Sequence, residues 1–327
     1  MAKIAVTDGL ADDAKKLLEK QGHEVVIQFY KNSELESGVL NNFDAVIVRS
    51  ATKLTASVIK KSSNLKVIAR AGVGVDNIDL EAAGSANIPV VNAPRASTQS
   101  VVELTIGHLL SCVRKVAKSD RSMREGKWEK KLFKGSELSG KTLGLVGFGR
   151  IAQGVGSIAQ SLGMNVHAYD PYLPPKIAKN QNTRLHKTVD TLFSNCTHIS
   201  IHCNLTEETR HLVNYDRITK MPGKSPDGIQ CGNHIVNCAR GGIVDETDVL
   251  KALNDGTLAS AALDVFEEEP VPEDYELCQH PNFHSTPHIG ASTIEAQRRV
   301  GLDVARNVML ILSNKKCDFI VNKQYLK

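Results

Sequence analysis

The sequence predicts an α/β protein of two domains, each with a parallel β-sheet, and three observations support this. The chain has 327 residues, 41% hydrophobic and 5% aromatic, with 24 glycines against 11 prolines, a composition that favours α/β over an all-β sandwich. Short apolar runs alternate with helical patterns, as in parallel sheets. The alternation begins again near the middle of the chain, so two domains with separate cores are expected.

The first domain is expected to contain five strands. Its apolar runs KIAVT, EVVI, DAVIV, KVIA and PVV begin at Lys3, Glu24, Asp44, Lys66 and Pro89. The segment 11–20 between the first two runs is amphipathic at helical spacing. No glycine-rich phosphate loop follows the first strand of this domain.

Two long helices are expected where the chain passes between the domains. The capping boxes Ser100-x-x-Glu103 and Ser292-x-x-Glu295 indicate their starts. Between these helices lie the strand candidates TLGLV, NVHAY, HISI, HIVN and SAALD. We therefore expect a first domain of residues 1–97, completed by the crossover segment 291–327, and a second domain of residues 98–290.

Charge and cysteine content exclude several classes of protein. Lys and Arg total 40 against 36 Asp and Glu, and no basic cluster large enough for a nucleic-acid face is present. No segment resembles a signal peptide or a membrane span, so we expect a cytoplasmic protein with no nucleic-acid or membrane partner. The seven cysteines contain no CxxC pair, which indicates reduced thiols.

The spacing of histidines raises the hypothesis of a metal site, which the sequence does not favour. His280, His284 and His288 are spaced by four, as on one face of a helix. Pro281 and Pro287 prevent a helix through these positions. No bound metal is therefore expected.

The stretch LGLVGFGRIAQG is typical of a dinucleotide-binding turn. Gly147 allows a tight turn after an apolar strand, Gly149 lets a pyrophosphate approach the backbone, and Ala152 fills the third position of the pattern. Asp170 ends the next strand candidate about twenty residues on, where a carboxylate holds the ribose hydroxyls. Because Asp170 repels a 2′-phosphate and no Lys or Arg follows before Lys176, we expect NAD in a Rossmann-like domain.

The stretch VNCARGGIVD places Arg240 after a strand, in a turn flanked by glycines. Strand ends of this kind face the ligand crevice in open α/β sheets, and a guanidinium suits a carboxylate or a polarised carbonyl. The alternative is a surface arginine that caps a helix or pairs with Asp245.

Two further stretches carry ionisable groups at strand ends. In ALDVFEEEP, Glu267, Glu268 and Glu269 follow an apolar strand, and since three carboxylates are costly to bury, two are expected to face solvent. In STPHIGAST, Pro287 keeps His288 out of a regular helix, and histidine is the usual proton shuttle near neutral pH. The alternative is a loop histidine without a role.

Taken together, these motifs resemble the D-2-hydroxyacid dehydrogenase family over nearly the whole chain. The segments that carry the resemblance are VRSATKLTASVI, RAGVGVDNIDLEAA, GKWEKKLFKGSELSGKTLGLVGFGRI, NCARGGIVDE, AALDVFEEEP and PHIGASTIEAQ. The resemblance implies two Rossmann-like/flavodoxin-like domains with the active site in the cleft between them. It assigns substrate binding to residues 1–97 with 291–327, NAD binding to 98–290, and a homodimer.

The resemblance also assigns the catalytic roles. Arg240 is expected to grip the substrate carboxylate and carbonyl, and His288 is expected to be the acid/base. Glu269, the carboxylate directly before the proline, would hydrogen-bond His288, so Glu267 and Glu268 are left to face solvent. A carboxylate beside an imidazole favours the charged form of the ring. A protonated ring can protonate a ketone in the reductive direction, and a neutral ring can accept the proton of an alcohol.

Binding residues follow from the same resemblance. The expected cofactor contacts are Gly147, Gly149, Arg150, Ile151, Asp170, Cys203, Cys238, Ala239, Arg240, Asp264, His288, Gly290 and Ala291. The expected substrate contacts are Arg49, Ser50, Arg70, Arg240 and His288, with Arg95 and Lys134 as weaker candidates. Two alternatives stay open: Arg49 pairs with Asp44, and Asp264 only caps a strand end.

Within the family, the first three segments are most similar to the branch that oxidises D-3-phosphoglycerate to 3-phosphohydroxypyruvate on the way to serine. The alternatives are a hydroxypyruvate or glyoxylate reductase and an NAD(H)-sensing, corepressor-like binding protein. Three departures stand out. Val73 replaces a threonine of many relatives, residues 221–233 are an insertion expected to form a surface loop, and no serine-sensing regulatory domain follows, so feedback by serine is not expected.

Overall fold

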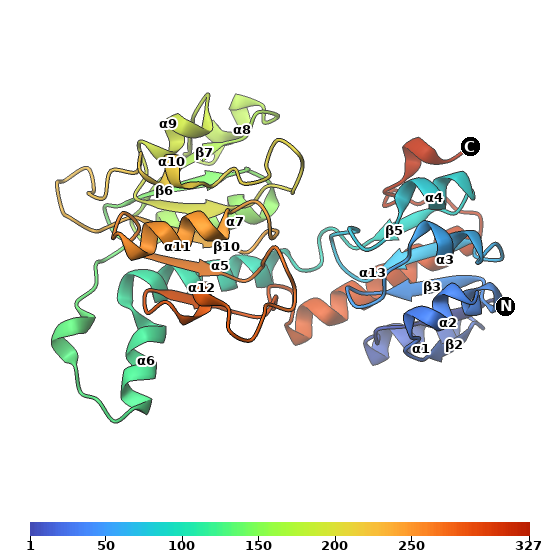
Figure 1. Ribbon diagram of the computed structural model, residues 1–327. Coiled ribbons are helices and arrows are strands. Elements are labelled where there is room, and N and C mark those ends of the chain that lie inside the picture. The colour runs from blue at the N-terminus through green and yellow to red at the C-terminus, as the bar shows by residue number, and fades with distance from the viewer. The chain divides into compact units, whose positions relative to one another are not determined.

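The computed structural model describes residues 1–327, which divide into two units of mixed α/β structure (Figure 1). The first unit consists of Met1–Ser97 and Ala291–Lys327, and the second unit of Thr98–Gly290. Each unit has its own sheet, and all strand pairs in both sheets are parallel. The predicted fold class, α/β with two parallel sheets, is confirmed.

The first unit is built on a five-stranded sheet in the order β2-β1-β3-β4-β5, the strand order of flavodoxin-like folds. The strands are short and rich in Val, Ile and Ala, as expected for strands that are covered on both faces. They are β1 (Lys3–Val6), β2 (Glu24–Ile27), β3 (Ala45–Val48), β4 (Val67–Arg70) and β5 (Val90–Asn92).

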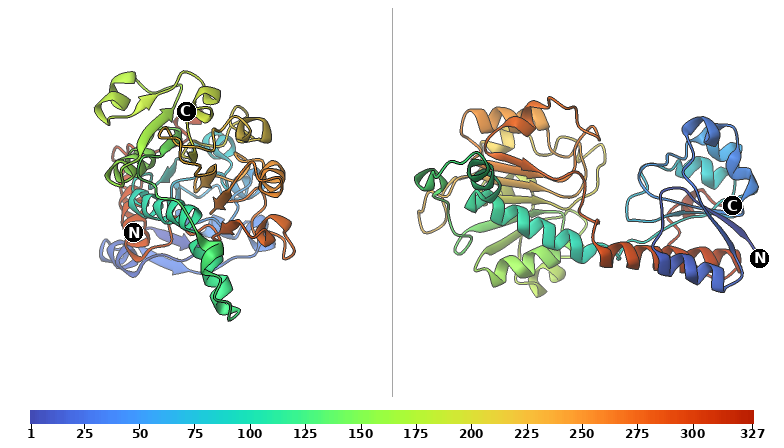
Figure 2. Two further views of the ribbon diagram at one scale, coloured as in Figure 1. Left: turned by 90° about the vertical axis from the view of Figure 1, so that its left-hand side faces the viewer. Right: turned by 90° about the horizontal axis from the view of Figure 1, so that it is seen from below.

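Successive residues of these strands face opposite layers of helices. Ile4 and Val6 pack beneath α1 (Asp12–Lys20) and α13 (Ile294–Leu312), which run side by side (Figure 2). Gly301 permits this close helix contact, because a Cβ there would lie 3.0 Å from the Ala14 Cβ. The other face is covered by α2 (Asn32–Glu36), η1 (Val39–Asn42), α3 (Ala56–Lys60) and α4 (Leu80–Ser85), and η3 (Lys323–Tyr325) lies against α4.

Both predicted capping boxes are wrong in position. Helix α5 (Thr98–Arg114) already includes Ser100, whose side chain is buried within it. Lys115 then adopts a left-handed conformation with φ +54°, which separates α5 from α6 (Val116–Arg124). At the start of α13 the cap is Thr293, whose hydroxyl accepts the Ala296 N–H. At α13 a neighbouring residue with the same capping chemistry was therefore enough to shift the predicted start.

The second unit has a seven-stranded sheet in the order β12-β11-β10-β9-β6-β7-β8. Numbered within the unit, this is 7-6-5-4-1-2-3, the Rossmann order with one further strand. The two edge strands β8 and β12 were missed by the sequence reading. The strands are β6 (Thr142–Val146), β7 (Asn165–Tyr169), β8 (Arg184–Leu185), β9 (His198–Ile201), β10 (His234–Asn237), β11 (Ser260–Leu263) and β12 (Phe283–Ser285).

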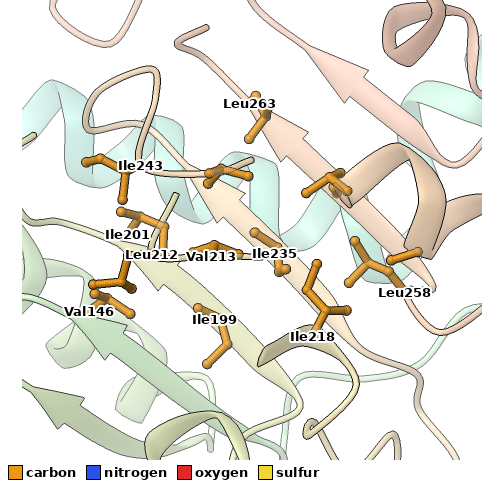
Figure 3. Packing of buried hydrophobic residues seen from close by; sticks show 14 of the residues in the cluster. Val146, Ile199, Ile201, Leu212, Val213, Ile218, Ile235, Ile243, Leu258 and Leu263 are labelled. Carbon is orange, nitrogen blue, oxygen red and sulfur yellow. The ribbon is translucent and has the colours of Figure 1, made fainter. Parts of the chain in front are cut away.

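Helices cover both faces of this sheet. One apolar cluster joins one face to α5, α7 (Arg150–Ser161) and α8 (Pro175–Asn180). The cluster on the other face includes Val146, Ile199, Ile235 and Leu263 (Figure 3). The helices packed on that second cluster are α9 (Val189–Phe193), α10 (Tyr215–Ile218), α11 (Glu246–Asn254) and α12 (Glu276–Gln279). Between α6 and β6 the chain forms the 3₁₀ turn η2 (Lys130–Phe133). None of the helices combines the length and the apolar character that a bilayer crossing requires.

Candidate active site

The predicted cofactor and catalytic residues of the second unit follow the carboxyl ends of its strands. Because all seven strands are parallel, these ends lie along one edge of the sheet. The strand order reverses between β6 and β9, and ligands of open α/β sheets bind at such a reversal. The turns in question are those after β6 (Gly147), β7 (Asp170), β9 (Cys203), β10 (Cys238 to Arg240), β11 (Asp264 to Glu269) and β12 (His288).

Gly147 makes the turn from β6 into α7. Its φ is +85°, and a Cβ would lie 2.9 Å from backbone atoms of His202 and Cys203, so only glycine fits between β6 and β9. Gly149 caps α7, and a Cβ there would meet nothing within 4 Å. Open space beside a helix N-terminus suits a pyrophosphate. These residues therefore fit the dinucleotide.

Asp170 is fixed next to the glycine turn. Its Oδ2 accepts the Phe148 N–H at 2.9 Å, and its Oδ1 accepts the Tyr172 N–H at 3.0 Å. Each carboxylate oxygen can accept a second hydrogen bond, so the group retains the capacity to hold ribose hydroxyls. In the first turn of α7, Arg150 is exposed and Ile151 packs against the apolar cluster beneath the helix.

Glu269 and His288 form a hydrogen-bonded pair. The His288 Nδ1 lies 2.7 Å from the Glu269 Oε2, while the Glu269 Oε1 accepts the Phe266 N–H at 3.0 Å. The carboxylate is thus tied both to the backbone and to the imidazole. Because Nδ1 is hydrogen-bonded to Glu269, the Nε2 of His288 is the nitrogen that can exchange a proton with a substrate. The His288 side chain is 46% exposed, so a substrate can reach it.

Asp264 is buried and organises the backbone around His288. Its two carboxylate oxygens accept hydrogen bonds from the Thr286 hydroxyl and from the N–H groups of Ile289 and Gly290. Its peptide oxygen accepts the His288 N–H at 2.9 Å. The strand-end capping role that the sequence left open is therefore present. A contact between Asp264 and the cofactor stays a prediction.

Arg240 lies in a turn that is fixed from both sides. The Asn237 side chain accepts the Ala239 N–H at 2.9 Å and donates to the Arg240 peptide oxygen at 2.8 Å. A Cβ on Gly241 would lie 1.7 Å from the Phe266 peptide oxygen, so this glycine lets the Arg240 turn pack against the start of the glutamate stretch. The Arg240 Nη1 donates to the Ala239 oxygen at 2.7 Å.

The two cysteines predicted to contact the cofactor carry neutral thiols. Burial raises the pKa of Cys203 to about 11 and that of Cys238 to about 12. Neither group is a nucleophile at neutral pH, so any contact with the cofactor is by packing. Ala291, the last predicted contact, is the first residue of the segment that returns to the other unit.

The glutamate stretch makes one contact that the sequence did not predict. The Glu267 Oε1 lies 2.8 Å from the His211 Nε2, and the His211 Nδ1 lies 3.2 Å from the Asp245 Oδ2. Glu267 is exposed, as predicted, and its contact with His211 is an addition that the sequence did not predict. In addition, the buried carboxylate of Glu246 accepts the Glu267 N–H at 2.7 Å. This second imidazole between two carboxylates gave no signal in the sequence.

The predicted substrate residues of the first unit lie at the carboxyl edge of its sheet. Val48 is paired in register with Arg70, so Arg49 and Arg70 lie at neighbouring strand ends. Asp8 accepts the Arg49 N–H at 2.6 Å, and Ser50 is exposed beside it. The Arg70 guanidinium lies against Gly72, where a Cβ would be 1.4 Å from Nη1.

The alternative pairing of Arg49 with Asp44 is wrong. Asp44 lies at the opposite end of β3, where its Oδ1 contacts the Lys66 Nζ at 2.9 Å. Among the weaker candidates, the Arg95 guanidinium lies 5.9 Å from the centre of the Phe319 ring. Arg95 is therefore held by a cation–π contact within the first unit.

Two other features lie at the amino-terminal edge of the second sheet. Lys134 lines a cavity of about 500 Å³ together with residues that begin β10, β11 and β12. The segment 221–233 forms a small hairpin closed by an antiparallel bridge between Lys224 and Gln230, directly before β10. Both lie at the edge opposite to the one that carries Arg240 and His288.

Several histidines pair with each other rather than gathering into a ligand set. The rings of His198 and His234 stack at 4.7 Å, and the Nε2 of His186 lies 3.0 Å from the Nδ1 of His167. No group of three or more His, Cys, Asp or Glu side chains is placed to hold a metal ion.

The sequence reading missed the residues that support the site. Asn237, Thr286 and Asp8 are polar residues at or beside strand ends, and this position was the only available signal. His108 lies within helix α5 and contacts Thr286 across 178 positions of the sequence. No local pattern in the sequence could have paired these two residues.

The fold and the site combine a Rossmann-like sheet, a glycine turn that suits a dinucleotide, and a histidine paired with a glutamate at the same sheet edge. The chain belongs to the D-isomer specific 2-hydroxyacid dehydrogenase family, because residues 106–290 match the NAD binding domain of that family. NAD is therefore the cofactor of the second unit, as predicted.

Individual relatives agree with this assignment. A D-3-phosphoglycerate dehydrogenase of Methanocaldococcus jannaschii is 45% identical over 98% of the chain and 60% of its own length. A hydroxypyruvate reductase of Thermotoga maritima is 44% identical over 94% of the chain and 97% of its own length. The NAD+-bound 3-phosphoglycerate dehydrogenase of Entamoeba histolytica has a TM-score of 0.80 and 32% identity, covering 98% of this chain and 99% of its own. The chain thus spans about 60% of the archaeal dehydrogenase.

Proposed function

We propose that the chain oxidises D-3-phosphoglycerate to 3-phosphohydroxypyruvate with NAD, the first step towards serine. The observation that supports this most is the Glu269–His288 pair, held at 2.7 Å on the same sheet edge as the dinucleotide turn at Gly147. Similarity to D-3-phosphoglycerate dehydrogenases over nearly the whole chain supports the choice of substrate.

In this proposal each residue of the site has its own role in the reaction. The His288 Nε2 accepts the proton of the substrate hydroxyl, and the Glu269 carboxylate stabilises the imidazolium that forms. Arg240 binds the substrate carboxylate and polarises the oxygen that becomes the carbonyl. NAD, when bound, takes up the hydride from the substrate carbon. In the reductive direction the charged His288 returns its proton to the ketone.

The phosphate of the substrate is assigned to Arg49, with Arg70 as the second cation. The two residues lie at neighbouring strand ends, and Asp8 holds the Arg49 backbone in place. A dianionic phosphate is well matched by guanidinium groups. Ser50 is the exposed residue that directly follows Arg49 and supplies a hydroxyl there.

The second candidate function is a hydroxypyruvate reductase, which the Thermotoga maritima relative favours because the chain spans 97% of its length. Rates with 3-phosphoglycerate and glycerate, and with the two matching keto acids and NADH, separate the candidates. We expect kcat/KM to favour the phosphorylated member of each pair. Equal values would contradict the proposed function, and turnover of neither pair would favour an NAD(H)-sensing binding protein.

The variant Arg49→Ala tests the phosphate assignment. The KM for 3-phosphoglycerate is expected to rise at least tenfold, since charge-assisted hydrogen bonds contribute about 1.5–3 kcal/mol. The KM for glycerate is expected to change little. The matched control is Arg95→Ala, which removes a nearby arginine that packs on Phe319. An unchanged KM for 3-phosphoglycerate in Arg49→Ala would remove Arg49 from the phosphate site.

A homodimer is also proposed, formed by the second unit. Helix α6 and the segment after it carry four apolar side chains that are each more than half exposed. They are Val116, Met123, Trp128 and Leu132. A second copy of this chain would cover them. Light scattering should give twice the 35.5 kDa of the chain, and Trp128→Lys should lower this value. A wild-type protein of monomer mass would contradict the dimer.

A further inference from the structure

A chain of partly buried hydrogen bonds runs from helix α5 to the turn that carries His288. His108 of α5 is buried, and its Nε2 lies 3.1 Å from the Thr286 Oγ1. The same hydroxyl donates to the Asp264 Oδ1 at 2.5 Å. Thr286 therefore stands between a buried imidazole and a buried carboxylate.

The direction of each hydrogen bond follows from proton counting. The Thr286 hydroxyl has a single hydrogen, and the Asp264 carboxylate can only accept it. The Thr286 oxygen must then accept from His108, so the His108 ring carries its proton on Nε2. Burial lowers the pKa of His108 and keeps the ring neutral. The neighbouring His284 ring, centred 5.2 Å away, is also neutral because burial lowers its pKa to about 4.

Asp264, held by Thr286, in turn fixes the backbone of the turn that carries His288. Its carboxylate accepts the N–H groups of Ile289 and Gly290, both at 2.8 Å, and its peptide oxygen accepts the His288 N–H. His288 has a φ of +52°, in the left-handed region that non-glycine residues rarely occupy. Such a conformation persists only where the surroundings impose it, and here three hydrogen bonds to Asp264 do so.

We propose that His108 and Thr286 are positioning residues for the acid/base His288. They hold the Asp264 carboxylate, and Asp264 holds the His288 backbone in the conformation that directs Nδ1 at Glu269. This inference rests on the proposed function, because it supposes that His288 transfers the substrate proton. Neither His108 nor Thr286 is assigned a contact with substrate or cofactor.

The experiment compares variants that remove or keep the donor at each position. Thr286→Val removes the hydroxyl at nearly constant size, and Thr286→Ser restores it. His108→Leu removes the ring donor, and His108→Gln keeps an N–H donor. The matched control is Thr197→Val, which breaks another buried threonine–histidine hydrogen bond, with His198 at 2.9 Å, at the amino-terminal edge of the same sheet.

Four quantities are measured for each variant. They are kcat and KM for 3-phosphoglycerate, the dissociation constant of NADH, and the proton NMR signal of the His288 Nδ1–H, assigned by its loss in His288→Gln. In Thr286→Val and His108→Leu we expect kcat to fall about tenfold or more, a fraction of the usual acid/base contribution. KM and the NADH dissociation constant should change less, and the Nδ1–H signal should shift or broaden. Thr286→Ser and His108→Gln should restore both kcat and the signal.

Three outcomes would overturn the inference. The first is a wild-type kcat with an unchanged His288 signal in Thr286→Val. The second is a loss of kcat without any change in that signal. The third is an equal loss in Thr197→Val, which would show general destabilisation instead. If the wild-type protein turns over no 2-hydroxy acid, the proposed function fails, while the NMR signal still decides whether Thr286 positions His288.

Discussion

His288 and Glu269 come from two different strand ends and meet at 2.7 Å between Nδ1 and Oε2. Glu269 is itself tied to the Phe266 N–H after β11, and the His288 turn is tied to Asp264. The imidazole is therefore oriented from two sides before any ligand binds. An acid/base group that is oriented in advance loses little on reaching the reactive geometry. This relationship explains why the strand at 260–263 ends in a glutamate-rich turn.

Removing the charge of Glu269 should slow the reaction without abolishing cofactor binding. In Glu269→Gln the amide can still accept the Nδ1–H, but no negative charge stabilises the imidazolium. We expect kcat to fall about ten- to a hundredfold, within the range of acid/base contributions. Steady-state kinetics measures this change, with the exposed neighbour Glu268→Gln as control. Equal effects of the two substitutions would contradict a specific role for Glu269.

Arg240 should not tolerate replacement by lysine. A lysine keeps the charge but lacks the planar fork that binds a carboxylate through two hydrogen bonds. We expect Arg240→Lys to raise KM for the hydroxy acid and to lower kcat, while the dissociation constant of NADH changes little. The control is Arg124→Lys, at a surface arginine that pairs with Asp120. A normal KM in Arg240→Lys would favour the alternative of a purely structural arginine.

Gly147 and Gly107 should respond in opposite ways to substitution by alanine. At Gly147 the φ of +85° alone costs about 1–2 kcal/mol for an L-residue, and the contacts at 2.9 Å add to this. Gly107 is exposed within α5 with open space around it, so Gly107→Ala should stabilise the helix by about 1 kcal/mol. Thermal unfolding and NADH titration measure both effects. A Gly147→Ala protein that binds NADH normally would contradict the tight dinucleotide turn.

Buried histidines should make stability depend on pH. Burial lowers the pKa of His234 to about 4 and the pKa of His198 well below its ordinary value of 6.5. Between pH 6.5 and 4 the unfolded chain thus binds more protons, so the unfolding free energy falls as pH falls. Each ring contributes a slope of up to about 1.4 kcal/mol per pH unit. Urea unfolding at pH 7 and 5 should show this loss, and His198→Asn should reduce it. A pH-independent midpoint would contradict the neutral buried pair.

Much of the fold could be predicted because the strands are uniform apolar runs. TLGLV, HISI and HIVN are buried on both faces, and such runs have few other structures available to them. The edge strands β8 and β12 are only two and three residues long, and neither has an apolar pattern of its own. The start of α13 was misplaced because its capping residue Thr293 lies beside Ser292, which has a similar side chain.

Residues of the site could be predicted from the sequence only where the chemistry of binding requires one particular residue type at a strand end. Gly147, Asp170 and Arg240 meet that condition, and the pairing of Glu269 with His288 was expected from the family resemblance. The contacts that orient these groups join residues far apart in the sequence, such as His108 with Thr286 and His211 with Glu267. Local patterns carry no information about such pairs, so only the folded structure reveals them.

The most direct test of the account compares His288→Gln with His211→Gln. Both histidines lie 2.7–2.8 Å from a carboxylate of the same glutamate stretch, but only His288 is assigned to proton transfer. We predict that His288→Gln lowers kcat for 3-phosphoglycerate oxidation by about 10²–10⁴-fold with NADH binding intact, while His211→Gln keeps nearly full activity. Comparable turnover by the two variants would contradict the central claim that His288 is the acid/base.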